Sequence, residues 1–74
     1  MRFTTPIYRD ELGIERGKPL TPETRREAVK KAVGRARSTW GSGADPWVIE
    51  EFHEYSPGDL VAAQVTVSGR RMAS

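Results

Sequence analysis

The chain contains no cysteine, one histidine and no long apolar run. Without cysteine it can form neither disulfides nor thiolate metal sites, which are the two commonest reinforcements of small domains. No stretch approaches the length of a membrane span, and residues 1–6 lack the apolar core of a signal peptide. These absences predict a cytoplasmic protein that stays out of the membrane and depends on packing for its stability.

Motifs for catalysis or cofactor binding are also missing. His53, with Asp45 and Glu51 as candidate companions, matches no metal-ligand spacing, and it is more typical of a structural side chain. Glu50 and Glu54 belong to a strand-like pattern and indicate a solvated face rather than an acid–base pair. There is no P-loop, dinucleotide fingerprint or nucleophile elbow. We therefore expect no enzyme, no cofactor and no metal.

What is present fits one small domain over residues 1–74. A chain of 74 residues has room for one core, and its 36% apolar and 30% charged residues are ordinary for a globular protein. We expect an α+β fold in which a single helix packs on a small antiparallel sheet, in the order β-α-β-β. The sheet comprises a C-terminal hairpin and an N-terminal strand over residues 1–8 with Phe3 and Ile7 inward. Residues 9–20 read as a connection, and residues 69–74 as a frayed tail.

The helix is expected over residues 22–40. Thr21 suits the N-cap, Pro22 the first position, and Gly41-Ser42-Gly43 the C-terminal end. Gly34 inside it is unfavourable for a helix and marks either a close approach of another backbone or chance. One side of the helix carries the apolar residues at three- and four-residue spacing: Ala28, Val29, Ala32, Val33, Ala36 and Trp40.

The hairpin is expected to pair residues 47–55 with 60–68 around the turn 56–59, which contains Pro-Gly. If Tyr55 lies opposite Leu60, neither sheet face is uniformly apolar. If Tyr55 lies opposite Val61, through an odd loop or a bulge, one face becomes a convincing core. We favour this second register, in which Trp47 also packs with Trp40 at a corner of the core. Its core face is Trp47, Ile49, Tyr55, Val61, Ala63, Val65 and Val67.

Charge is segregated along the chain. Residues 22–40 carry six Lys or Arg against two Glu, whereas residues 41–59 carry five carboxylates and no Lys or Arg. The helix cations fall on two flanks of its polar side and could follow phosphates, which makes a nucleic-acid-binding protein the second hypothesis. Its candidate residues are Arg26, Lys30 and Arg37 on one flank, and Lys31 and Arg35 on the other.

The first hypothesis is a non-catalytic protein-interaction module. In the favoured register the outer sheet face combines apolar anchors with acidic residues, as binding surfaces for proteins often do. The candidate protein-binding residues are Val48, Glu50, Phe52, Glu54 and Leu60. Because the basic and acidic surfaces belong to different elements, two copies could also attract each other as a homodimer.

The segment Arg25-Arg26-Glu27-Ala28-Val29-Lys30-Lys31-Ala32-Val33-Gly34-Arg35-Ala36-Arg37 is rich in Arg, Ala, Gly and Val. With the short length and the lack of cysteine, it resembles small accessory proteins of phages that infect high-GC actinobacteria. The resemblance is one of style and transfers no site. It implies binding to a host or phage component rather than metabolism.

Overall fold

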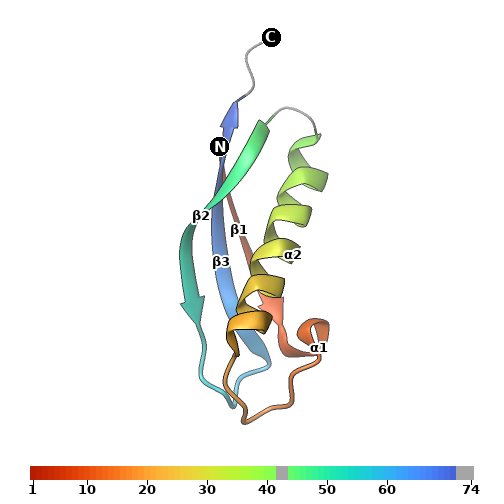
Figure 1. The fold of residues 1–74 in the computed structure, drawn as a ribbon, viewed down its shortest axis with the longest axis vertical. Coiled ribbons are helices and arrows are strands. Elements are labelled where there is room, and N and C mark those ends of the chain that lie inside the picture. Colours follow the sequence, from red (N-terminus) through yellow and green to blue (C-terminus); the bar gives the residue numbers. More distant parts are fainter. Residues whose placement is uncertain (42–43, 72–74) are drawn as a thin grey trace.

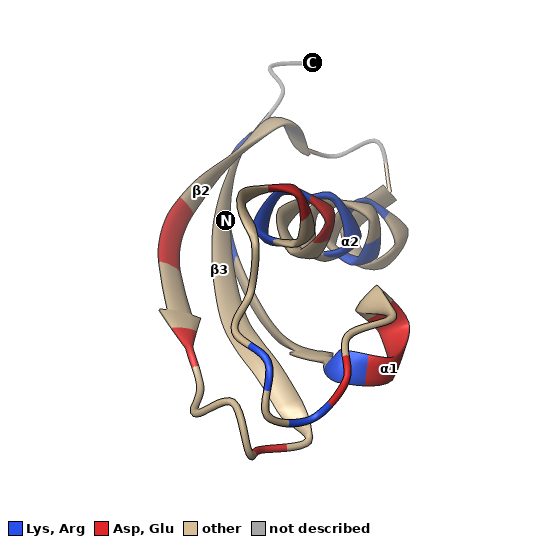
Figure 2. Cartoon of the chain, turned by 60° about the horizontal axis from the view of Figure 1, so that its bottom comes forward, with Lys and Arg blue, Asp and Glu red and all other residues tan. Residues whose placement is uncertain are grey.

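Three antiparallel strands and one long helix form the framework of the computed structural model, which describes residues 1–41 and 44–71. The elements follow in the order β1 (Arg2–Tyr8), α1 (Arg9–Leu12), α2 (Pro22–Trp40), β2 (Ala44–Glu54) and β3 (Val61–Arg71). The sheet order is β1-β3-β2, and α2 lies over one of its faces (Figures 1 and 2). The predicted α+β fold is confirmed, with α1 as an additional turn of helix.

Helix α2 has the bounds that its sequence signals predict. The Thr21 hydroxyl accepts the Thr24 amide at 3.2 Å, and the Thr24 hydroxyl accepts the Thr21 amide at 2.7 Å, so the two residues form a capping box. Gly41 ends the helix with a positive φ of 62°, which glycine adopts without strain. The rest of the predicted end, Ser42 and Gly43, lies outside the described residues.

Small side chains line the face of α2 that meets the sheet. Ala28, Ala32 and Ala36 recur every fourth residue and are fully buried, which allows the helix to lie close to the strands. The larger core side chains come mainly from the sheet, including Ile7, Trp47, Val65 and Val67. Most of the predicted core is therefore confirmed.

Two details of the predicted helix packing are wrong. Trp40 is 42% exposed, so it does not form a core corner with the buried Trp47. Of the two readings of Gly34, the close backbone approach is the wrong one, because a Cβ at this position would meet nothing within 4 Å.

The outer strands flank a long central β3. β1 pairs with β3 as the N-terminal pattern predicts, with Ile7 buried and Phe3 packed against the core. β3 extends to Arg71, so the first part of the predicted tail belongs to the sheet. Residues 72–74 of that tail lie outside the described residues.

A β-bulge changes which side chains of β2 face the helix. Trp47 pairs with Gly69 and Ile49 with Val67, as the favoured register predicts. The register shifts between Ile49 and Glu51, and Phe52 then pairs with Val65. One extra residue in a strand reverses the alternation of every side chain that follows it. The predicted register is therefore right before the bulge and wrong after it.

The connection between α1 and α2 is tied to the hairpin turn by Arg9. Its side chain is 3% exposed, and its guanidinium donates to the carbonyls of Lys18 at 2.8 Å, Ser56 at 3.0 Å and Asp59 at 2.5 Å. Arg16 adds bonds of 2.8 and 3.1 Å to the carbonyl of Gly58. Two arginines thus join polar loops that have few apolar side chains to hold them.

Candidate protein-binding groove

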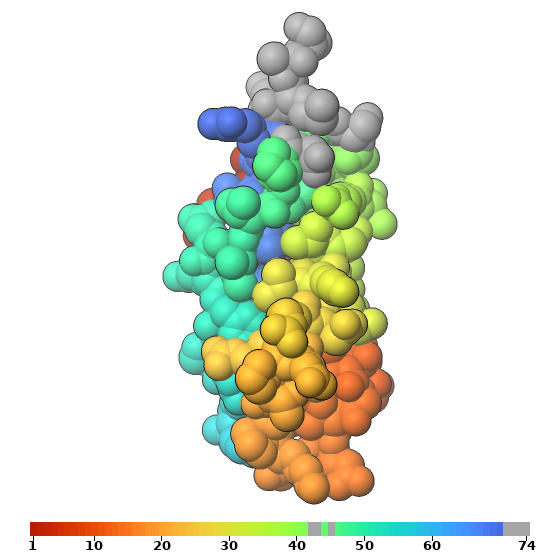
Figure 3. Space-filling model, in the orientation of Figure 1, coloured from red at the N-terminus to blue at the C-terminus, as the bar shows by residue number. Residues whose placement is uncertain are grey.

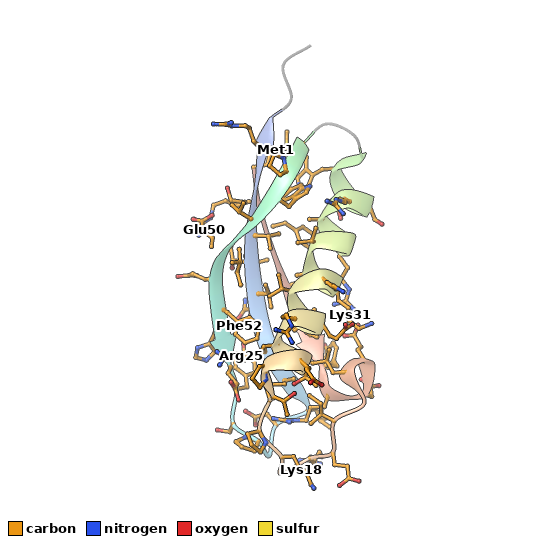
Figure 4. The ribbon with its side chains drawn as sticks, in the orientation of Figure 1. Met1, Lys18, Arg25, Lys31, Glu50 and Phe52 are labelled. Carbon is orange, nitrogen blue, oxygen red and sulfur yellow. The ribbon has the colours of Figure 1, made fainter. Side chains whose placement is uncertain are left out.

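The five side chains predicted to form one outer sheet patch are divided among three places. Val48 and Glu50 lie on the outer face, where Val48 is 58% exposed and Glu50 pairs with Arg2 at 3.4 Å. Figure 4 shows Glu50 pointing away from α2. Leu60 lies in the turn before β3, 64% exposed, and lines a surface hollow with Tyr8 and Ile14.

Phe52 and Glu54 lie on the face that α2 covers, which corrects their predicted placement. Phe52 packs against the core, and the Arg25 guanidinium lies 5.1 Å from the centroid of its ring (Figure 4). Glu54 accepts the Leu20 amide at 3.4 Å. The cause is the bulge after Ile49, which turns both side chains to the helix side.

Polar side chains that bond to one another occupy much of the outer sheet face. The Thr4 and Thr66 hydroxyls are 2.9 Å apart, and the Tyr55 hydroxyl donates to the Gln64 amide oxygen at 2.8 Å. Tyr55 was expected in the core, and the bulge places it here instead, with its ring edge-on to His53 at 4.9 Å. This face is therefore less apolar than the sequence pattern indicates.

The charges near His53 do not assemble into a metal centre. Among the residues that the structure describes, no group of three or more His, Asp or Glu side chains is placed to hold a metal ion. The side chain of Asp45, a candidate companion of His53, lies outside the described part.

The basic residues of α2 lie on two flanks, as predicted, but Arg35 is engaged within the protein. Arg35 pairs with Glu11 and donates to the carbonyl of Pro6 at 2.9 Å, which joins α2 to α1 and β1. Lys31 is half-buried on the same flank. Arg26, Lys30 and Arg37 are exposed on the flank towards β2. The five candidate phosphate-binding residues therefore do not form one continuous surface.

A groove runs between α2 and β2 on that second flank. Its apolar side chains are Val29, Ile49 and Phe52, and its rim carries cations. Figure 3 shows the hollow between α2, yellow to green, and β2, in teal, with the blue of β3 visible at its base. The cations that complete the lining are Arg25, Arg26 and Lys30.

The burial of Ile49 is the part of this site that the sequence pattern predicts wrongly. It points to the helix side, as predicted, yet it is 47% exposed because α2 does not cover the edge of β2. The signal in the sequence that could have indicated the groove is the spacing of the two apolar residues that β2 contributes to it. Ile49 and Phe52 are three residues apart, and a strand keeps both on one face when a bulge lies between them.

Fold and groove together define a small α+β domain with a half-open apolar groove at one sheet edge, bordered by arginine and lysine. Comparison with protein-family models, with curated proteins and with solved structures finds no match for the chain. Within the described residues, no helix is both long and apolar enough to cross a lipid bilayer.

Proposed function

We propose that the protein is a non-catalytic protein-interaction module that binds its partner in the groove between α2 and β2. The observation that carries this proposal is the exposure of Ile49, 47%, beside the partly buried Phe52. Both side chains point to the helix side of the sheet, where burial is favourable, yet α2 leaves them incompletely covered. Apolar groups in a groove with a polar rim are a common form of protein-binding site.

Nucleic-acid binding by the basic face of α2 is the weaker alternative. Arg35 is held by Glu11 and by the carbonyl of Pro6, so one of the five predicted phosphate contacts is already engaged within the protein. The apolar floor of the groove contributes nothing to phosphate binding, whereas it suits an apolar side chain of a protein. A homodimer, a cytoplasmic location and a role as a phage accessory protein stay predictions from the sequence.

Two neighbouring side chains of β2 provide a matched test. Ile49 and Val48 are similarly exposed, 47% and 58%, but point to opposite faces of the sheet. The wild-type chain, Ile49→Glu and Val48→Glu would be immobilised and exposed to nuclease-treated and untreated extracts of the cells that express the protein. Circular dichroism would first establish that both variants keep the fold.

The proposal expects a stoichiometric protein that is retained by the wild type and by Val48→Glu and is lost with Ile49→Glu, with or without nuclease. Loss with Val48→Glu alone would move the site to the outer sheet face and overturn the proposal. Retention that disappears after nuclease treatment would instead support the nucleic-acid alternative. Equal retention by all three chains would exclude both sheet faces near residues 48 and 49.

A further inference from the structure

We infer that the segment bound in this groove is an acidic amphipathic helix of the partner protein. The inference rests on the proposed function and adds the chemistry and the conformation of the occupant. Three features of the groove carry it: an apolar stripe of defined length, cations along that stripe, and an irregular edge on β2.

The apolar stripe extends along α2 beyond the lining of the groove. At 100° per residue, Val29, Val33 and Trp40 lie within about 40° of one another on the flank towards β2. Val33 is partly buried and Trp40 is 42% exposed. From Val29 to Trp40 the helix rises by roughly 16 Å at 1.5 Å per residue, which equals about three turns. A partner helix of three turns would cover the stripe.

Cations accompany the stripe on its solvent side. Arg26 and Lys30 border the groove, and Arg25 lies over the ring of Phe52. The contact between Lys30 and Glu27 on this rim is long, at 4.0 Å, and both side chains are exposed. An occupant with Asp or Glu beside its apolar side chains would complement these charges, and a basic occupant would be repelled.

The edge of β2 favours a helix over an added strand. The pairing of β2 is irregular between Ala44 and Trp47, a stretch that contains Pro46, and again at the bulge between Ile49 and Glu51. Proline and bulges hinder the pairing of another strand with an edge. A helix satisfies its own backbone hydrogen bonds, so it needs only side-chain contacts from the groove.

The charges of the groove also argue against a second copy as the occupant. If two copies met groove to groove, their rims would bring Arg25, Arg26 and Lys30 together with the same residues of the other copy, and like charges repel. Glu50, an acidic residue of β2, points to the opposite face of the sheet, where it pairs with Arg2.

Selection from a random library of displayed 16-residue peptides on the immobilised full chain tests the inference. Enriched peptides would be synthesised, labelled, and titrated by fluorescence anisotropy against the wild type, Ile49→Glu and Val48→Glu. We expect enriched sequences with apolar residues at three- and four-residue spacing flanked by Asp or Glu. We also expect their affinity to fall at least tenfold with Ile49→Glu and to stay within twofold with Val48→Glu.

Two double variants that lose the same charge test whether the cations of the groove rim contact the peptide or whether the positive charge of the whole protein attracts it. Arg26→Gln with Lys30→Gln removes two rim charges, whereas Lys18→Gln with Arg70→Gln removes two exposed charges elsewhere. Because each exposed ion pair contributes modestly, losing two of them should weaken binding by roughly two- to thirtyfold. The second pair should change it by less than twofold.

The possible results distinguish this inference from the proposed function. Peptides that need the groove for binding but are neutral or basic, or that alternate apolar and polar residues as a strand does, would overturn the inference of an acidic helix. They would still support the proposed function, which is binding of a partner in the groove. Enriched peptides whose affinity for Ile49→Glu equals their affinity for the wild type would overturn both the inference and the proposed function. The absence of any enriched peptide would do the same. A dimer in sedimentation experiments that Ile49→Glu dissociates would show that the occupant is a second copy, against the inference.

Discussion

The indole ring of Trp47 occupies the space that a side chain at position 69 would need. Trp47 and Gly69 pair across β2 and β3, and a Cβ on Gly69 would lie 2.8 Å from carbons of the buried ring. Because the ring has to move within a packed core, we expect Gly69→Ala to lower the free energy of unfolding by about 1 to 3 kcal/mol. Urea denaturation measures this change, and a loss below about 0.5 kcal/mol would contradict the argument.

Gly34→Ala also adds a Cβ to a glycine, but here we expect the free energy of unfolding to rise. It lies inside α2, and an added Cβ would meet nothing within 4 Å. Alanine restricts the unfolded chain more than glycine does and suits a helix better. Gly34→Ala should therefore raise the free energy of unfolding by about 0.5 to 1 kcal/mol. A destabilised Gly34→Ala variant would show that another part of the molecule does approach the helix here.

Arg9 should be the most sensitive charged position in the described part of the chain. Its buried guanidinium serves the carbonyls of Lys18, Ser56 and Asp59, and lysine lacks the planar fork that reaches all three. We expect Arg9→Lys to cost about 2 kcal/mol or more in urea denaturation, because a buried cation would lose hydrogen bonds that join the two loops. Arg16→Lys, at an exposed position, should cost less than about 0.5 kcal/mol.

Regular periodicity explains which parts of the fold could be predicted from the sequence. The spacing of Ala28, Ala32 and Ala36 places one face of α2 against the sheet, and both ends of α2 have capping residues. Alternation in β3 likewise places Val65 and Val67 in the core. These signals are local, because each residue's position follows from neighbours within one or two turns or along one strand.

The candidate site could not be predicted because it depends on an irregular feature and on how far the helix extends across the sheet. The bulge after Ile49 moves Phe52 to the groove, and no residue type requires a bulge at that point. The exposure of Ile49 follows from the distance between α2 and the sheet edge, which periodicity does not contain. The role of Arg9 was hidden for a related reason, since its three acceptors are main-chain atoms of distant loops.

Glu11 and Arg35 should be coupled more strongly than the exposed pair on the same helix. The side chains of Arg35 and Glu11 are 38% and 22% exposed, whereas those of Lys30 and Glu27 are 77% and 57% exposed. In double-mutant cycles with glutamine we expect a coupling free energy of about 0.5 to 1 kcal/mol for the first pair. The second pair should give less than about 0.5 kcal/mol. Equal values would mean that Arg35 is free to contact an external anion.

Substitutions at Phe52 and Val48 test which side chains of β2 face the helix. The structure, with its bulge, places Phe52 on the helix side, whereas the uninterrupted alternation that the sequence indicates places it on the outer face. On the helix side, a carboxylate at position 52 would be desolvated against the core, although it would lie near Arg25. We expect Phe52→Glu to lower the free energy of unfolding by about 2 to 4 kcal/mol, and Phe52→Leu by less than about 1.5 kcal/mol. Val48→Glu, on the outer face, should stay within about 0.5 kcal/mol of the wild type. If Phe52→Glu were as stable as Val48→Glu in urea denaturation, Phe52 would lie on the outer face, and the groove would lose its aromatic wall.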